Sequence, residues 1–384
     1  MKSIKSLPAL KGAKVLVRVD YNVPIVNNKI RDTRRITSSF ETISTILKKG
    51  GTPILLAHLG DSTASLRPVA TLLSKTYNIV FITHDVMDTH IHSIIEQVPK
   101  GTIILLENIR QYEGEEKNDV TFAKTLSKLG QYFVNDAFSV SHRKHASVVG
   151  IAKYLPSFAG AQMQKEIAAL SPVLNNKKHP FVFILGGAKF ETKIPLLKRF
   201  ATLADNVVIT GAIMNSFYNE AGFPVGKSVV EDGFAKPISA LLKNPAVLLP
   251  PDCLVIRNEE TVTVTPLEIE AQDVIVDIGP QSVALITEKI MKAKLVVWNG
   301  PTGWYEKGFV KATTALAKAT IASKAHTVIG GGDTGAVVEK IFGITGASAK
   351  ATALQRKNIF ISTGGGATLE YLANGTLPGI TALK

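Results

Sequence analysis

The stretch HTVIGGGDTGAVVEK, residues 326–340, places four glycines and one carboxylate between a predicted buried strand and a predicted helix. Three of these glycines have the spacing G-x-G-x-x-G, which is typical of a dinucleotide site. The same loop could instead hold the phosphates of a mononucleotide with its backbone N–H groups. Asp333 favours the mononucleotide, because a carboxylate beside phosphates requires a divalent cation between them. A tight turn without a ligand is the third interpretation, and the loop alone leaves all three open.

Basic and polar side chains follow the predicted strands of the N-terminal half. In open α/β sheets, ligands bind beyond the carboxyl ends of the strands, where arginines can hold a phosphate or a carboxylate with two hydrogen bonds. The pattern therefore predicts an anion site in this half of the chain. Its candidate residues are Arg18, Asp20, Asn22, His58, Arg110, His142 and Arg143.

The C-terminal half has glycines at the corresponding positions. Bare backbone at successive strand ends suits a planar base and a polyphosphate. Lys189 and Lys193 are spaced i, i+4 at the start of a predicted helix, so they share one face and offer the positive charge that phosphoryl transfer requires. The strand-end glycines are Gly186, Gly187, Gly211, Gly300, Gly330, Gly331, Gly332, Gly364, Gly365 and Gly366.

The composition is that of a globular protein, with 384 residues of which 45% are hydrophobic and 20% charged. No apolar run approaches the roughly 18 residues of a membrane span, and the N-terminus shows no signal-peptide pattern. The single cysteine, Cys253, excludes an internal disulfide, so we expect a cytoplasmic protein without a membrane role. The net charge of +13 suits polyanionic small molecules, and no RNA-binding or zinc-finger motif points to nucleic acid as the main partner.

Strands, glycine-rich or polar turns and helices alternate along the chain, which indicates an α/β fold with parallel sheets. We predict two lobes, each a doubly wound, Rossmann-like and mainly parallel sheet flanked by helices, joined by a hinge helix. The N-terminal domain is predicted over residues 1–165, the helix and linker over 166–180, and the C-terminal domain over 181–366. The tail 367–384 is expected to pack back on the N-terminal domain. Predicted strands cover 13–19, 53–57, 102–106, 132–135, 181–185, 206–209, 295–298, 327–329 and 358–362, and predicted helices cover 36–49, 122–129, 161–174 and 282–293.

Taken together, the motifs resemble those of the phosphoglycerate kinase family over nearly the whole chain. The matching stretches include VRVDYNVP, DTRRI, AHLG, LRPVA, LLENIR, EEKND, VNDAFSVSHRKHASVVGI, ILGGAKFETKI, VDIGP, VVWNGPTGWYE, GGGDTGA and STGGGATLEYL, in the family's order. The resemblance implies reversible phosphoryl transfer from 1,3-bisphosphoglycerate to ADP. It places 3-phosphoglycerate in the N-terminal lobe and Mg²⁺ with ADP or ATP in the C-terminal lobe.

The resemblance also implies roles for single residues. Asp333 resembles the family's magnesium-holding aspartate, which accounts for the carboxylate in the glycine-rich loop. Catalytic roles are implied for Arg35, Lys189, Lys193 and Gly332. The implied triose-binding residues are Arg18, Asp20, Tyr21, Asn22, Arg35, His58, Leu59, Gly60, Asp61, Arg110, His142 and Arg143. The implied nucleotide-binding residues are Gly187, Lys193, Gly211, Asn299, Glu306, Gly331, Gly332, Asp333 and Thr334.

The chain departs from the family pattern at Asp61, where the family has an arginine. Arg34 and Arg35 compete for one family position, and the following Ile36 favours Arg35. An NAD-dependent dehydrogenase and a non-catalytic metabolite-binding relative are the alternative functions. We expect a monomer whose domains close to bring the two substrates in line.

Overall fold

The computed structural model describes residues 1–174, 178–188, 190–341 and 358–384. The chain forms two compact units, the first with Met1–Ala168 and Asn374–Lys384 and the second with Ala169–Ala373. This division differs from the predicted bounds at two places. Residues 367–373 belong to the second unit and not to the tail of the first. The boundary between the units falls after Ala168, inside helix α7 (Ala161–Leu174), so the predicted linker region is divided between the two units.

The sheet of the first unit has six parallel strands in the order β5-β6-β4-β1-β7-β8. Strands β4 and β6 are completely buried, as in parallel sheets that helices cover on both faces. After β1 the chain forms β4, β5 and β6 on one side of that strand and then β7 and β8 on its other side. The strand order therefore reverses at β1. The bounds are β1 Lys14–Arg18, β4 Thr52–Leu56, β5 Ile79–Ile82, β6 Ile103–Leu106, β7 Tyr132–Asn135 and β8 Ser157–Ala159.

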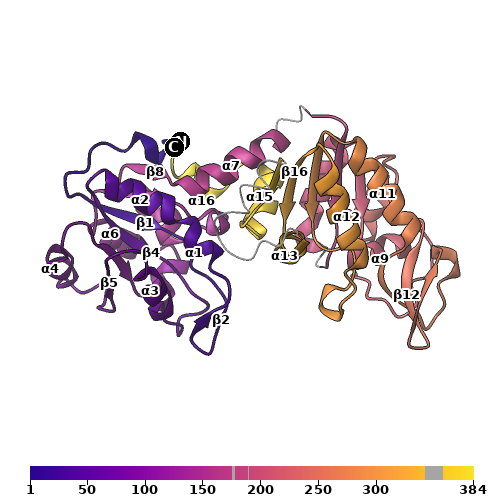
Figure 1. Cartoon of the computed structure of the whole chain (residues 1–384), viewed down its shortest axis with the longest axis horizontal. Coiled ribbons are helices and arrows are strands. Elements are labelled where there is room, and N and C mark those ends of the chain that lie inside the picture. The colour runs from indigo at the N-terminus through magenta and orange to yellow at the C-terminus, as the bar shows by residue number, and fades with distance from the viewer. Residues whose placement is uncertain (175–177, 189, 342–357) are drawn as a thin grey trace. The chain divides into compact units, whose positions relative to one another are not determined.

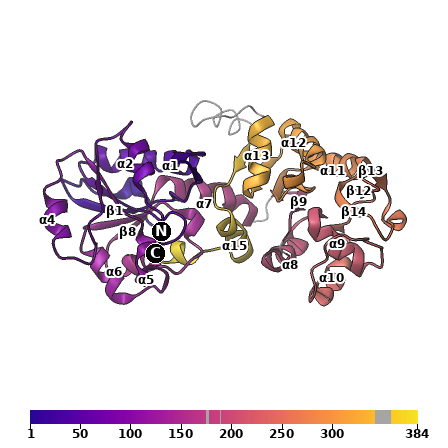
Figure 2. The same ribbon diagram turned by 90° about the horizontal axis from the view of Figure 1, so that it is seen from below.

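Helices cover both faces of this sheet (Figure 1, Figure 2). On one face lie α1 (Arg34–Ser38) and α2 (Phe40–Lys48), and on the other α5 (Glu113–Glu116) and α6 (Val120–Ser127). Helix α6 begins after Asp119, whose carboxylate accepts a hydrogen bond from the Phe122 N–H at 2.8 Å, as an N-cap does. The unit also contains α3 (Arg67–Leu73), α4 (Ile91–Glu96), α16 (Pro378–Thr381) and a hairpin of β2 (Ile25–Val26) and β3 (Lys29–Ile30).

The sheet of the second unit also has six parallel strands, in the order β11-β10-β9-β15-β16-β17. Its strand order reverses between β9 and β15, which are both completely buried. The carboxyl ends of these two strands are therefore the expected ligand position. The bounds are β9 Phe181–Leu185, β10 Asn206–Ile209, β11 Val247–Leu248, β15 Leu295–Asn299, β16 His326–Gly330 and β17 Ile359–Ile361.

Two groups of helices flank the second sheet (Figure 2). One group is α8 (Ile194–Leu203), α9 (Gly211–Glu220) and α10 (Ala235–Leu242), and the other is α11 (Pro280–Lys292), α12 (Lys311–Ala322) and α13 (Gly332–Ile341). Helix α15 (Gly366–Asn374) follows β17. A separate antiparallel sheet is formed by β12 (Cys253–Arg257), β13 (Glu260–Val264) and β14 (Val274–Ile278).

The structure confirms the predicted α/β class with two parallel-sheet units. The single helix predicted over 36–49 is wrong, because Ser39 separates α1 from α2. The Ser39 hydroxyl donates to the Ile36 carbonyl at 2.7 Å and contacts the Tyr21 hydroxyl at 3.0 Å, and such back-bonding by serine interrupts helices. The prediction also missed β5, β8, β11 and the antiparallel sheet. Among the described residues, no helix combines the length and the apolar character needed to cross a lipid bilayer.

Candidate active site

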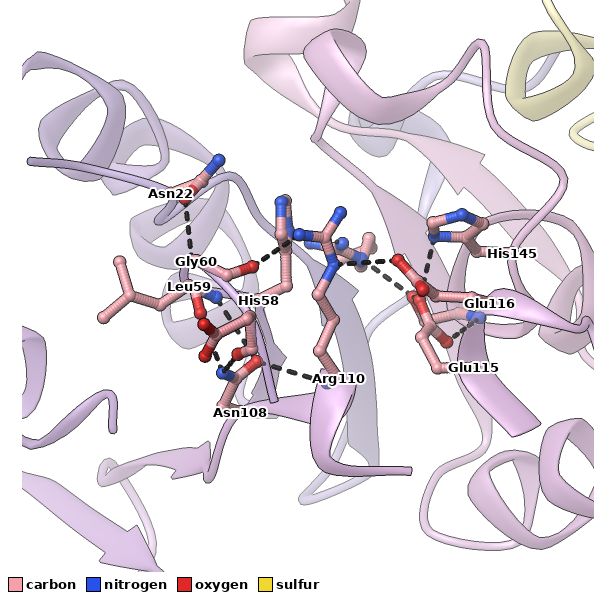
Figure 3. A network of polar contacts seen from close by, with 12 residues as sticks. Asn22, His58, Leu59, Gly60, Asn108, Arg110, Glu115, Glu116 and His145 are labelled. Carbon is pink, nitrogen blue, oxygen red and sulfur yellow. Dashed lines mark hydrogen bonds and ion pairs between the residues drawn. The ribbon is translucent and has the colours of Figure 1, made fainter. Parts of the chain in front are cut away.

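The predicted polar residues of the first unit follow the carboxyl ends of four neighbouring strands, β6, β4, β1 and β7. Figure 3 shows Asn22 and Arg110 connected through Gly60. Strand β1 leads into Asp20 and Asn22, β4 into His58 and Gly60, and β6 into Arg110. Parallel pairing brings these loops to one edge of the sheet. The loops touch directly, since Gly60 N donates to Asn22 Oδ1 at 3.0 Å and Arg110 Nη1 donates to the Gly60 carbonyl.

Arg18, the last residue of β1, lies beneath this edge and is only 1% exposed. Its Nη2 lies 3.0 Å from His58 Nδ1, its Nε donates to Ser147 Oγ at 2.8 Å, and its Nη1 donates to the Val19 carbonyl. Each guanidinium nitrogen therefore has a protein partner. These bonds use three of the five N–H groups of the guanidinium, so the contact of Arg18 with the triose stays a prediction.

His58 is 2% exposed and has no charge at neutral pH. Burial lowers its pKa far below the usual range, and the positive charge of Arg18 lowers it further. A guanidinium can only donate hydrogen bonds, so Nδ1 of His58 accepts and the ring proton is on Nε2. His58 thus offers a neutral N–H donor.

The loop from Leu59 to Leu66 is held by two residues that follow β6. Asn108, which is fully buried, shares the two N–H groups of Nδ2 among the carbonyl oxygens of Leu59, Asp61 and Ala64, each at 2.8 Å. Glu107 accepts from Leu66 N and from Ser65 Oγ, both at 2.8 Å. Sequence reasoning did not assign a function to either residue, although both occur in the quoted stretch LLENIR.

Asp20 and Arg35 form an ion pair at this edge, with Nη1 of Arg35 3.2 Å from Oδ2 of Asp20. The same nitrogen donates to the Asn22 carbonyl at 3.0 Å. Arg34 instead forms an ion pair with Asp32, which does not belong to the candidate site. The structure therefore places Arg35 beside Asp20 and Asn22, and its role in binding the triose stays a prediction.

Arg110 and Arg143 supply the remaining positive charge of the site. Arg110 Nε lies 3.2 Å from Oε1 of Glu116, and burial lowers the pKa of Arg110, with a further contribution from the nearby Arg143. Arg143 and His142 are both half-buried in the loop that follows β7. This cluster of cations suits an anionic ligand.

Two of the predicted triose ligands do not present a side chain to the site, and the side chain of a third is hydrogen-bonded within its own loop. Tyr21 and Leu59 belong to the hydrophobic core of the unit, so only their backbone atoms could contact a ligand. Asp61 is exposed, and its Oδ1 accepts from Thr63 N at 2.8 Å and from Thr63 Oγ1 at 2.7 Å. The negative charge of Asp61 is therefore held within its own loop.

The strand-end glycines of the second unit pack backbone against backbone. Gly211 has φ of +63°, and a Cβ atom there would lie 2.3 Å from Gly187 N. A Cβ atom on Gly300 would lie 2.2 Å from the Gly186 carbonyl oxygen. Contacts between loops thus already require glycine at these positions. The sequence pattern suggests that these glycines make room for a planar base. Because the loop contacts alone require glycine, the glycines are not by themselves evidence of a bound base.

Lys193 lies beside these glycines and is 8% exposed. Its Nζ donates to the Gly186 carbonyl and would lie 3.1 Å from a Cβ atom on Gly187. Burial lowers the pKa of Lys193 to about 8, and the negative charge of Glu231 opposes that shift. A buried lysine with few fixed partners can give its charge to a ligand phosphate.

Asn299, Gly331 and Thr334 lie together at the start of α13. A Cβ atom on Gly331 would lie 3.5 Å from Asn299 Nδ2 and 3.9 Å from Thr334 Oγ1. Thr334 is fully buried, and within the described ranges its hydroxyl has no hydrogen-bond partner. Gly332 and Asp333 form the first turn of this helix. A buried hydroxyl without a described partner at the start of a helix fits an oxygen-rich ligand such as a phosphate.

Lys189 and Glu306 are the remaining predicted residues of this unit. Lys189 lies outside the described residues. Glu306 is exposed on the short 3₁₀ helix η8 (Tyr305–Lys307), beside Trp304, whose side chain is 44% exposed. Among the described residues, no group of three or more His, Cys, Asp or Glu side chains could hold a metal ion by itself.

The fold defines a class, that of α/β proteins built from two parallel-sheet units. The sequence profile of the phosphoglycerate kinase family matches residues 4–375. The chain belongs to the phosphoglycerate kinase family, and it is a kinase.

Relatives and solved structures agree with this family. A phosphoglycerate kinase of Chlorobium phaeobacteroides is 40% identical over 398 residues, which cover 98% of each chain. One of Dictyoglomus turgidum is 38% identical and covers 98% of this chain and 96% of its own. The solved phosphoglycerate kinase of Coxiella burnetii superposes with a TM-score of 0.85 at 33% identity, covering 99% of this chain and 97% of its own.

Proposed function

We propose that the chain transfers a phosphoryl group reversibly between 1,3-bisphosphoglycerate and ADP, giving 3-phosphoglycerate and ATP in glycolysis. The P–O bond of the acyl phosphate breaks and a P–O bond to the β-phosphate of ADP forms. The observation that carries the proposal is the buried Lys193, whose Nζ contacts the Gly186 carbonyl at the carboxyl end of β9. A cation held there can meet the charge of a phosphoryl group in transfer.

The triose is assigned to the first unit. Asp20, Asn22, Arg35, His58, Arg110 and Arg143 line the carboxyl edge of its sheet. Arg35, Arg110 and Arg143 would neutralise phosphate and carboxylate groups, and His58 would donate from Nε2 to a ligand oxygen. Asp20 and Asn108 would orient these groups through the contacts described above.

The nucleotide is assigned to the second unit, with Gly187, Gly211, Asn299, Glu306, Gly331, Gly332, Asp333 and Thr334 as its contacts. The N–H groups at the start of α13 would face the phosphates. Asp333 would hold a Mg²⁺ ion with help from Thr334, and Mg²⁺ neutralises phosphate charge when it is bound. Glu306 would bind the ribose.

Catalysis in this proposal is positioning and charge neutralisation. Lys193, Lys189, Arg35 and the N–H of Gly332 would stabilise charge on the transferred group. Because each substrate belongs to a different unit, transfer requires a closing motion that aligns them and excludes water. We also assign the chain as a cytoplasmic monomer.

A coupled assay tests this function directly. The purified chain with Mg-ATP and 3-phosphoglycerate should form 1,3-bisphosphoglycerate, detected by a coupled dehydrogenase that consumes NADH. Binding of both substrates without turnover would indicate a non-catalytic relative. Reduction of NAD⁺ with 3-phosphoglycerate as the hydride donor, in the absence of the coupled dehydrogenase, would support the dehydrogenase interpretation of the loop at 326–340.

A further inference from the structure

A buried chain of polar contacts runs beneath the first unit's candidate site, from α5 to His58 (Figure 3). It consists of Glu115, Ser147, Arg18 and His58. Arg18 Nε donates to Ser147 Oγ at 2.8 Å, and Ser147 Oγ lies 2.6 Å from Oε1 of Glu115. The far end is the pair of Arg18 Nη2 and His58 Nδ1 at 3.0 Å. All four residues are almost completely buried.

The direction of each hydrogen bond in this chain is fixed by chemistry. Arg18 can only donate, so Ser147 Oγ accepts from it and uses its own proton for Glu115. Oε2 of Glu115 accepts from Ser147 N at 2.9 Å. Both carboxylate oxygens thus act as acceptors, which is the pattern of an ionised carboxylate. Burial raises the pKa of Glu115, while the Arg18 charge and the Ser147 bonds oppose that shift.

Glu115 supplies the buried negative charge that Arg18 needs. Burial lowers the pKa of Arg18, and the charge of Glu115 is the largest opposing contribution. The neighbouring Arg110 and Arg143 repel Arg18. A buried guanidinium without a compensating carboxylate is strongly destabilised. On another side of the same cluster, Oε1 of Glu115 lies 3.7 Å from Nδ1 of His145.

We propose that Glu115 and Ser147 are positioning residues for His58: they orient Arg18 so that His58 keeps its proton on Nε2 and aims that N–H at an oxygen of the triose. The tautomer assignment rests on the structure, and its consequence for the triose rests on the proposed function. Nε2 makes no hydrogen bond to a described residue, so its proton is available to a ligand. With the proton on Nδ1 instead, Nε2 of His58 would present a lone pair to a ligand oxygen that also carries lone pairs, and the two atoms would repel each other.

Glu115→Gln is the sharpest test because it keeps the shape of the side chain, removes its negative charge and replaces one acceptor oxygen with a donor NH₂ group. A glutamine has one acceptor oxygen and an NH₂ group, so one of the two Ser147 donors would face a donor. If the NH₂ faces Ser147 Oγ, that hydroxyl must accept from it, in competition with Arg18. Glu113→Gln is the matched control, since Glu113 lies on the same helix, is 84% exposed and forms an ion pair with Lys117.

The readout is the ¹⁵N NMR spectrum of the histidine rings in the full chain, with His58 assigned from the spectrum of His58→Gln. The native chain and Glu113→Gln should show His58 with its proton on Nε2. Glu115→Gln should show a mixture of tautomers and raise the Michaelis constant for 3-phosphoglycerate about tenfold. The Michaelis constant for Mg-ATP should stay within about twofold, since no nucleotide contact changes.

Ser147→Ala gives a second, milder variant if Glu115→Gln does not fold. It keeps the Ser147 N contact with Glu115 and removes the hydroxyl link to Arg18, so the same shift in tautomer is expected. An unchanged His58 tautomer in a folded variant overturns the proposal. A shifted tautomer in a chain without kinase activity would retain this inference and reject the proposed function.

Discussion

Asn108 and Leu59 bind each other twice: Asn108 Nδ2 donates to the Leu59 carbonyl at 2.8 Å, and Leu59 N donates to Asn108 Oδ1 at 3.3 Å. This pair fixes the backbone that leads into Gly60, and Gly60 contacts both Asn22 and Arg110. One buried amide thus connects the ends of β4 and β6.

Asn108→Ala should therefore weaken triose binding although its side chain faces the protein. Three carbonyls would lose their buried donor, at a cost of about 1–3 kcal/mol in the free energy of unfolding. We expect the Michaelis constant for 3-phosphoglycerate to rise several-fold and that for ATP to stay constant. Asn219→Ala, an exposed position on α9, is the control and should change neither. Equal losses for both substrates would show a general loss of structure.

Lys193→Ala should lower the turnover number by about 10²-fold or more, because its charge meets the phosphoryl group in transfer. Steady-state kinetics on both substrates would measure this. Lys198→Ala, exposed on the adjoining helix α8, should retain native turnover. Near-normal turnover with a raised Michaelis constant would instead assign Lys193 to substrate binding alone.

Activity should also fall as the pH rises through the pKa of Lys193, which burial lowers to about 8. Below that pH the amine is protonated and carries the required charge, and above it the charge is lost. Lys193→Arg should remove this alkaline limb from the profile of kcat/KM for ADP, because arginine stays protonated. An identical alkaline limb in Lys193→Arg would assign it to another group.

Asp136 should make the stability of the first unit depend on pH. Burial raises its folded pKa from 3.8 to about 7, and Gln162 N and Met163 N, which donate to its Oδ1, oppose that shift. Between those values the folded state binds more protons than the unfolded state, so the free energy of unfolding falls as the pH rises, by at most about 4 kcal/mol.

Asp136→Asn should flatten this part of the profile, because asparagine does not titrate. Urea unfolding of both chains from pH 4 to 8 measures the difference. The two midpoints should move apart as the pH rises and run parallel above pH 7. Parallel curves over the whole range would assign the titration to other groups.

Gly211→Ala should destabilise the second unit more than Gly222→Ala. Both glycines have positive φ, +63° and +85°, so alanine is strained at each by about 1 kcal/mol. At Gly211 the new Cβ would also lie 2.3 Å from Gly187 N, whereas at Gly222 nothing lies within 4 Å. The difference in urea midpoint between the two variants measures the cost of the steric clash between the new Cβ atom and the loop of Gly187. Equal midpoints would mean that the loops separate without cost.

Asp61→Asn should change triose affinity little. Asparagine can keep the Thr63 contacts through its carbonyl oxygen, so the variant removes only the charge. Since Asp61 is exposed, any gain in affinity for 3-phosphoglycerate should appear at low ionic strength and vanish at high salt. A large gain that persists at high salt would mean that Asp61 faces the ligand directly.

The sequence by itself determined the fold class and most of the central strands. Runs such as Phe181–Leu185 are apolar throughout because both faces of a parallel sheet are covered, and the strand at Tyr132–Asn135 was predicted to the residue. Motif order was sufficient to indicate the family. Edge strands such as β11 were missed, since two residues carry no periodic signal.

Tertiary structure alone decided which polar residues face the site and which support it. Arg18 and Arg110 look alike in the sequence, since Arg18 ends the apolar strand β1 and Arg110 lies in the short segment after the apolar strand β6. Only the folded chain shows that Arg18 is enclosed by Ser147 and His58, whereas Arg110 lies at the edge of the sheet. The reason is physical: the partners of a buried charge come from segments far apart in the chain, and Ser147 follows Arg18 by 129 residues. Local sequence patterns carry no record of such contacts.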